Sequence, residues 1–173
     1  MRTAIYQLLA TLHGRHGPRR FGMICQKFLA IAYREAGFAH IVERGVQGVD
    51  VDAANGSYER YSIELKTTTK DSVQLKQKDI DGLMSRQADG YLTLLGVLRL
   101  GTLSDWWLAM ATELRAGCLC VDRLRPYRRK DLEEFINPFL DGVIEQHFEG
   151  AFTGSQAYLD GVLQQKGIEI IRL

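Results

Sequence analysis

The chain has 173 residues, a length that is typical of one domain. Its 46% hydrophobic and 25% charged content is that of an average globular protein, which excludes a disordered, collagenous or fibrous chain. The 22 Lys and Arg residues nearly balance the 21 Asp and Glu residues, and the net charge of +1 indicates no partner. Any nucleic-acid-binding surface must therefore concentrate positive charge locally. We expect residues 1–173 to form a single domain.

The three cysteines, Cys25, Cys118 and Cys120, form a sparse and odd-numbered set. Without a secretory signal sequence, such a set indicates reduced thiols and a cytoplasmic protein. We expect them to be buried small side chains, since no further pair at zinc-ligand spacing is present. Apolar runs such as Leu92–Leu98 are too short to span a bilayer, so no membrane partner is expected. The sequence also contains no phosphate-binding loop or dinucleotide fingerprint, which argues against a nucleotide cofactor.

The N-terminal part begins with two segments of helical spacing, over residues 3–13 and 21–36. Gly14 and the pair Gly17-Pro18 interrupt the pattern between them. From Gly48 the hydrophobic residues alternate with a period of two, over residues 48–53 and again over 61–66. The turn residues Asn55-Gly56-Ser57 lie between these two segments. This pattern predicts a β-hairpin with one apolar and one polar face.

The remaining pattern predicts alternating helices and strands. Two strands that are apolar on both faces suit the middle of a sheet, and Pro138 either kinks a helix or begins a second one after Asn137. The expected segments are a helix over 75–88, strands over 91–98 and 106–112, a short strand over 117–124, helical spacing over 132–148, a helix over 155–166 and a terminal strand over 168–173. The order α-β-β-β-α-β-β-α predicts an α/β fold with a central mixed β-sheet and helices on both of its faces.

The register of the hairpin decides which side chains share its polar face. A tight two-residue turn would place the acids of the first strand beside Tyr61 and Ile63, which mixes polar and apolar groups on both faces. A longer loop over residues 55–59 instead places Asp52 opposite Ser62 and Asp50 opposite Glu64. The apolar positions then all point into the core, so we expect this register; they are Val49, Val51, Ile63 and Leu65.

In this register the polar face carries concentrated negative charge. Asp50 and Glu64 would lie with their Cβ atoms about 5 Å apart, and two like charges at about 4 Å repel by roughly 4 kcal/mol at an effective dielectric near 20. Together with Asp52 they face one cation, Lys66. A divalent cation would offset this charge, because carboxylates, a backbone carbonyl and waters form an ordinary Mg²⁺ site.

These residues resemble the PD-(D/E)xK nuclease superfamily, which includes restriction endonucleases and archaeal Holliday-junction resolvases. The resemblance rests on Gly48-Val49-Asp50, a turn, and Ile63-Glu64-Leu65-Lys66-Thr67-Thr68, and it covers about residues 21–112. Val49 stands where the family usually has proline. The helix glutamate of many members is replaced by Gln26, with Glu35 as a candidate substitute, and Gln74 is the candidate for a polar residue that often follows the lysine. The segment 130–173 forms a C-terminal extension outside the resemblance.

The resemblance implies a restriction-endonuclease-like core and an Mg²⁺-dependent DNA endonuclease, with Mn²⁺ as a substitute metal. In this interpretation Asp50 and Glu64 hold the metal with the Leu65 carbonyl, Lys66 positions the attacking water, and Asp52 is a further accessory candidate. The family also implies a homodimer, for which the terminal strand or the helix around Pro138 would supply the interface.

Two basic clusters are the candidate DNA contacts. They contain Arg19 and Arg20 in the first, and Arg125, Arg128, Arg129 and Lys130 in the second. The pair Trp106-Trp107 is expected to pack in the core. Two alternatives to a nuclease stay open, a catalytically inactive nuclease fold that binds DNA and a protein-interaction domain with a solvated acidic face. The DNA substrate, whether a specific site, a junction or a free end, is open as well.

Overall fold

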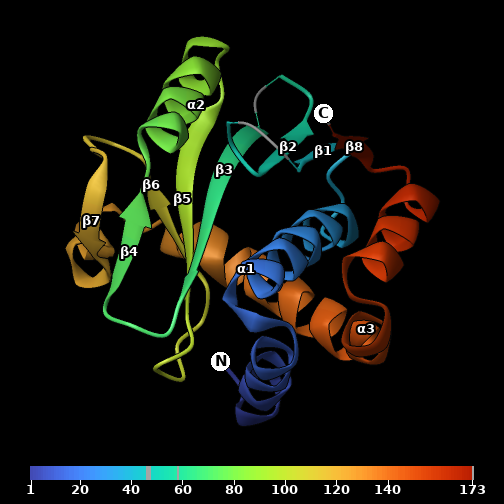
Figure 1. Ribbon diagram of the computed structural model, residues 1–173. Coiled ribbons are helices and arrows are strands. Elements are labelled where there is room, and N and C mark those ends of the chain that lie inside the picture. The colour runs from blue at the N-terminus through green and yellow to red at the C-terminus, as the bar shows by residue number, and fades with distance from the viewer. Residues whose placement is uncertain (46–47, 58, 173) are drawn as a thin grey trace.

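The computed structural model describes residues 1–45, 48–57 and 59–172. Its centre is a six-stranded sheet in the order β6-β5-β3-β2-β1-β8, in which β3 pairs with β5 and β1 with β8 in parallel and the other neighbours are antiparallel (Figure 1). The strands are β1 (His40–Arg44), β2 (Val51–Asn55), β3 (Glu59–Thr68), β5 (Leu92–Arg99), β6 (Trp107–Met110) and β8 (Glu169–Ile171). The predicted mixed α/β fold is confirmed.

The first helix, α1 (Thr3–Glu35), breaks where the sequence predicted a break. Gly17 has φ 73° and ψ 167°, a conformation that glycine adopts readily, and Pro18 begins the second helical segment. Gly14 is helical and causes no interruption. The fixed φ of proline suits the first position of a helix, so the pair Gly17-Pro18 alone produces the bend.

The second long helix, α3 (Lys130–Gln165), packs against α1 on the same face of the sheet (Figure 1). It continues through Pro138 and breaks at Ser155, which has φ 53° and ψ −138°. Asn137 begins no new helix. Its side-chain amide donates to the carbonyls of Glu133 (2.9 Å) and Trp106 (3.2 Å), which ties this turn of α3 to the end of the β5–β6 connection.

The opposite face of the sheet is covered by α2 (Gln77–Ala88) and by a small two-stranded sheet of β4 (Ser72–Leu75) and β7 (Gly117–Cys120) (Figure 1). The predicted strand over 117–124 ends at Cys120, where the 3-10 helix η1 (Val121–Tyr127) begins. The short strands β1 and β4 and the second sheet were not predicted. Each has too few alternating residues to show a period of two in the sequence.

The two layers of core meet at β5, whose side chains alternate between them. Leu94 and Leu98 pack toward α1 and α3, whereas Leu95 and Val97 pack toward α2 and the small sheet. This confirms that the strand is apolar on both faces because both are covered. The two tryptophans are buried as expected, with Trp106 in the first layer and Trp107 in the second.

The cysteine expectation holds only for Cys25, which is buried in α1. Cys118 and Cys120 are exposed, because they share the outward face of β7, whereas Leu119 on the other face packs against the core layer beneath the small sheet. The predicted terminal strand is observed as β8, and Leu173 lies outside the described residues. No helix in the described ranges is long and apolar enough to cross a membrane.

Candidate active site

The β2–β3 hairpin has the register that the longer loop predicts. Val51 pairs with Ile63 and Asp52 with Ser62, and the strands separate beyond Asn55 and Glu59. Tyr58 in the loop lies outside the described residues. The four predicted apolar positions, Val49, Val51, Ile63 and Leu65, are all buried, which confirms that burying one face fixes the register.

Asp50, Glu64 and Lys66 meet in one cavity of about 300 Å³ at the start of the hairpin. Asp50 directly precedes β2, and its Oδ2 accepts a hydrogen bond of 2.7 Å from the backbone N–H of Leu65. Glu64 on β3 is only 3% exposed, and its Oε1 lies 2.6 Å from Nζ of Lys66, two residues along the same face. The remaining walls come from α1, the loop before β2 and the first turn of α2.

The two carboxylates are crowded and poorly compensated. Burial raises the pKa of Asp50 well above its usual value, against the opposing effects of the Leu65 N–H and the Lys66 ammonium. Burial also raises the pKa of Glu64, and the neighbouring Asp50 raises it further. One lysine therefore does not offset the negative charge that this cavity gathers when both groups are ionised.

Lys66 has a second acidic partner, Asp79, which the sequence interpretation missed. Its Nζ lies 2.7 Å from Oδ2 of Asp79, at the third position of α2. Burial alone would lower the pKa of Lys66, but Glu64 and Asp79 outweigh it and the pKa is raised. Asp79 also caps α2 by accepting the N–H of Lys76 at 2.9 Å. An acid three residues into a predicted helix is a recognisable capping signal, although it does not reveal the contact with Lys66.

Asp52 is neutralised within the protein and is separate from this pair. Its Oδ2 binds Arg44 (2.9 Å) and Arg86 (2.6 Å), and its Oδ1 accepts a 2.6 Å hydrogen bond from Ser62. The expectation that three acids face one lysine is therefore wrong for Asp52, because Arg44 on the neighbouring strand β1 and Arg86 on α2 compensate its charge. The acids that gather around Lys66 are instead Asp50, Glu64 and Asp79.

Gln26 of α1 lies in the wall of the cavity, at the position where the resemblance placed it. Its amide nitrogen donates to Oε1 of Glu43 (2.8 Å) and to the carbonyls of Arg44 (2.7 Å) and Asp50 (3.2 Å). Glu43 is buried and also forms an ion pair of 3.2 Å with Lys27. Gln26 thus fixes the backbone that carries Asp50, and its side chain contributes an amide where many nucleases have a carboxylate.

The other two accessory candidates lie outside the cavity. Glu35, at the end of α1, pairs with Lys166 at the end of α3. Gln74 belongs to β4, where it pairs with Cys118 across the small sheet. The polar group that enters the cavity after Lys66 comes from Asp79 instead.

The donor set at Asp50 and Glu64 suits a hard divalent cation. Oε2 of Glu64 is buried and has no hydrogen-bond partner among the described residues. Leu65 also lines the cavity, and its backbone N–H donates to Asp50. Because the N–H and C=O of one strand residue point to the same side of the strand, the Leu65 carbonyl points to the side of Asp50. In the described part of the chain no three His, Cys, Asp or Glu side chains are grouped as metal ligands. Two carboxylates and a carbonyl could hold Mg²⁺, which retains several waters as ligands.

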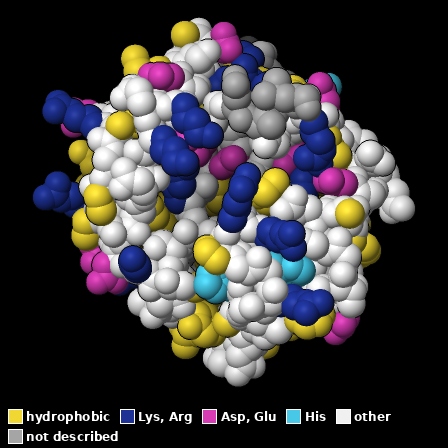
Figure 2. All heavy atoms as spheres, in the orientation of Figure 1, with side chains coloured by type: hydrophobic (Ala, Val, Ile, Leu, Met, Phe, Trp, Pro, Cys, Tyr) yellow, Lys and Arg dark blue, Asp and Glu magenta, His cyan; other side chains and the backbone are white. Residues whose placement is uncertain are grey.

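The first basic cluster reaches the cavity through Arg19, which lines it together with Lys76 and Lys78. Arg20, its neighbour on α1, is exposed. Figure 2 shows acidic side chains recessed in a hollow, with Lys and Arg side chains around the opening. The arrangement places positive charge at the rim and negative charge at the floor.

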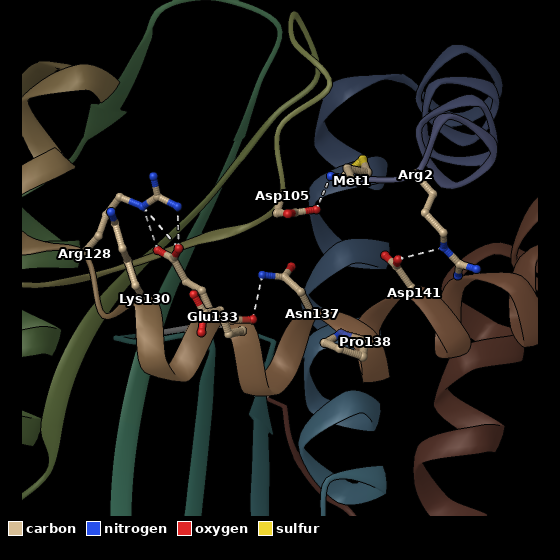
Figure 3. A pocket seen from close by; sticks show the side chains of 10 residues that line it. Met1, Arg2, Asp105, Arg128, Lys130, Glu133, Asn137, Pro138 and Asp141 are labelled. Atoms are coloured by element: carbon tan, nitrogen blue, oxygen red, sulfur yellow. Dashed lines mark hydrogen bonds and ion pairs between the residues drawn. The ribbon is translucent and has the colours of Figure 1, made fainter.

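The three arginines of the second basic cluster form ion pairs with acidic residues of the protein. Arg128 binds Glu133 with Nε 3.0 Å from Oε1, beside Lys130 in a separate cavity of about 860 Å³ (Figure 3). Arg125 pairs with Asp122, and Arg129 pairs with Asp131. None of these residues lines the cavity of Asp50 and Glu64.

Comparison with known proteins gives one line of support, from solved structures. No family model matches the chain, and no curated protein matches it. The fold is similar to that of Hjc, a Holliday junction resolvase from the archaeal hyperthermophile Archaeoglobus fulgidus, with a TM-score of 0.52 and 14% sequence identity. The match covers 65% of this chain and 95% of the resolvase. This similarity confirms the nuclease-like fold that the hairpin motif predicts.

Proposed function

We propose that the protein is an Mg²⁺-dependent DNA endonuclease that hydrolyses phosphodiester bonds, with Mn²⁺ as a substitute metal. The observation that carries this proposal is the pair of poorly compensated carboxylates, Asp50 and Glu64, beside Lys66 in one open cavity. Burying such a pair costs free energy in the metal-free protein, and a bound cation would offset it. The resolvase-like fold supports the same class of activity.

In this mechanism Asp50, Glu64 and the Leu65 carbonyl would hold the metal. When bound, Mg²⁺ would supply charge neutralisation and Lewis-acid polarisation of the scissile phosphate. Lys66 has three ammonium protons, and its contacts with Glu64 and Asp79 use two of them. The third would orient the attacking water and stabilise charge that develops on the phosphate. Asp79 would position Lys66 by fixing its ammonium group.

The basic rim would bind the DNA backbone. Arg19, Lys76 and Lys78 line the cavity and would neutralise phosphates on either side of the scissile bond. Arg20 would extend this contact along α1. We propose a secondary DNA contact for the second cluster, whose arginines would exchange acidic partners for phosphates; it comprises Arg125, Arg128, Arg129 and Lys130.

Cleavage of both strands of a duplex would require two active sites, and a two-fold homodimer is the simplest way to supply them. The strand β8 lies at the edge of the sheet, so its outer side could pair with a second chain. The surface of α3 around Pro138 is the other candidate interface. Light scattering should then report about twice the monomer mass of 19.6 kDa, and a particle that stays monomeric on DNA would contradict the dimer.

Of the two alternatives, burial argues against a solvated acidic face, since Glu64 and Asp52 are each only 3% exposed. An inactive DNA-binding protein would share the fold and the basic rim, and only catalysis separates it from a nuclease. The test must therefore measure metal binding and cleavage separately.

The experiment compares thermal melting with and without Mg²⁺ or Mn²⁺, alongside plasmid nicking, for the wild type and Lys66→Ala. The wild type should melt at a higher temperature in the presence of metal and should nick DNA. Lys66→Ala removes the cation nearest to the carboxylates, so it should retain the metal-induced shift and lose nicking. Lys70→Ala, an exposed lysine beyond the end of β3, is the matched control and should behave as wild type. Normal nicking by Lys66→Ala would overturn the mechanism.

A further inference from the structure

A pair of arginines beside the active site is held in place by one buried carboxylate. Arg44 of β1 and Arg86 of α2 both bind Oδ2 of Asp52, and their side chains remain 25% and 20% exposed. One carboxylate can neutralise only one of them. Arg86 also contacts Asp89 at 2.8 Å, but Asp89 is 53% exposed, and such surface pairs contribute little. The pair therefore carries one positive charge more than the buried Asp52 neutralises, and the acidic groups that face it from the cavity wall, Asp81 and Asp89, are on the surface side.

These arginines line a second cavity, of about 620 Å³, that continues from the first. Arg44, Gly48 and Lys78 line both cavities, and Arg86 lines the second. A Cβ atom on Gly82 of α2 would lie 2.5 Å from Cα of Gly48, so the two backbones touch here without an intervening side chain. Gly48 has φ +83°, which also favours glycine. A polymer backbone could pass from one cavity to the other across this point.

Beyond the second cavity the cationic groups continue at the ring of one tyrosine, Tyr91. The guanidinium of Arg86 and that of Arg60 each lie 4.1 Å from the ring centroid of Tyr91. Arg60, on β3, forms no ion pair within the described ranges, and it lines a further cavity with Tyr91. Stacking on an aromatic ring fixes a guanidinium while leaving its N–H groups available for anions.

We propose that Arg44, Arg86 and Arg60 form an arginine track that binds successive phosphates of one DNA strand as it leaves the scissile phosphate. This inference rests on the proposed nuclease function and adds the path of the substrate. Asp52 is a positioning residue for the track, because it orients two guanidiniums toward the cavity. The planar, multidentate guanidinium is suited to a phosphodiester group, which offers two acceptor oxygens.

The test measures binding of a fluorescent DNA duplex in metal-free buffer over a range of salt concentrations, so that cleavage plays no part. Each phosphate contact contributes about 0.9 to the slope of log affinity against log salt. Arg86→Gln and Arg60→Gln should each lower the slope by about that amount, and Asp89→Asn should strengthen binding by removing a negative charge from the cavity wall. Arg60→Gln tests the track even if Arg86→Gln destabilises the fold, since the contact found for Arg60 is the Tyr91 ring. The control is Arg115→Gln, an exposed arginine in the connection between β6 and β7 that belongs to neither basic cluster, and it should leave the slope unchanged.

The outcomes separate the track from the nuclease. If the wild type binds and cleaves DNA but neither Arg60→Gln nor Arg86→Gln changes the slope, the track is overturned and the nuclease stands. If the slopes fall as expected and the wild type does not cleave with Mg²⁺ or Mn²⁺, the track stands as a DNA-binding surface and the nuclease is overturned. Failure of the wild type to bind duplex DNA overturns the track, whereas the nuclease is judged by plasmid nicking with Mg²⁺ or Mn²⁺.

Discussion

Two acidic regions on the same face of one hairpin have opposite electrostatic environments. Asp52 and Glu64 are equally buried, at 3% exposure each. Two arginines and a serine hydroxyl satisfy Asp52, whereas Glu64 and its neighbour Asp50 share one lysine, which Asp79 also binds. The fold is thus able to neutralise a buried carboxylate on this face. Of Asp50, Asp52 and Glu64, it neutralises only Asp52. The poorly compensated charge is confined to the cavity, where a cation and a substrate would enter.

The largest effect should come from removing a cavity carboxylate. Asp50→Asn or Glu64→Gln should lower plasmid nicking by about 1,000-fold, as expected for loss of a group that stabilises charge in the transition state. Each variant should also lose the metal-induced rise in melting temperature, because half of the carboxylate ligand set is gone. Asp52→Asn, measured in parallel, should keep the metal-induced rise. A metal-induced rise that survives in Glu64→Gln and disappears in Asp52→Asn would reverse the roles of the two regions.

In the absence of metal, the replacement of Asp52 should reduce the free energy of unfolding more than the replacement of Glu64. Asp52→Asn leaves Arg44 and Arg86 facing each other without their shared buried counter-charge, and only the exposed Asp89 remains beside Arg86. Urea unfolding should therefore show a loss of about 2 kcal/mol. Glu64→Gln relieves repulsion with Asp50 and should be as stable as wild type or more stable. Comparable losses in both variants would mean that Glu64 is compensated as well as Asp52 is.

The stability of the metal-free protein should also depend on pH through the cavity pair. The folded-state pKa values of Asp50 and Glu64 are raised above their unfolded values, which are about 3.9 and 4.3. The folded state therefore binds more protons than the unfolded state, and stability should fall as pH rises from about 4 through the raised pKa values, about 7 for Asp50 and about 8 for Glu64. The loss should be about 1.4 kcal/mol for each unit by which one of these pKa values is raised. The double variant Asp50→Asn, Glu64→Gln should lack this decline when unfolding is measured across the same range in the presence of a chelator. A wild-type curve that coincides with that of the double variant would show that neither carboxyl has a raised pKa.

The contrast also explains what the sequence could and could not predict. Alternating apolar residues determined the register, so Asp50, Glu64 and Lys66 were correctly expected on one face. The partners of Asp52 come from β1, a short strand without clear alternation, and from Arg86, 34 residues along the chain. Such a contact depends on how α2 packs across the sheet, which local periodicity does not determine. Asp79 gave a local signal as a helix cap, but its contact with Lys66 depends on the same packing.

The smallest effect is expected for loss of one of the two arginines at Asp52. Arg44→Gln leaves Asp52 with Arg86, whose Nη2 lies 2.6 Å from Oδ2, and with the hydroxyl of Ser62. The buried carboxylate stays paired, and the removed guanidinium is a quarter exposed, so urea unfolding should show a loss of only about 0.5 kcal/mol. The double variant Arg44→Gln, Arg86→Gln removes both cations and should lose more than the sum of the single variants, because only then is Asp52 left buried without a counter-charge. Additive losses would mean that each arginine contributes independently. In that case neither would be surplus to the needs of Asp52, and its positive charge would not be available for a phosphate.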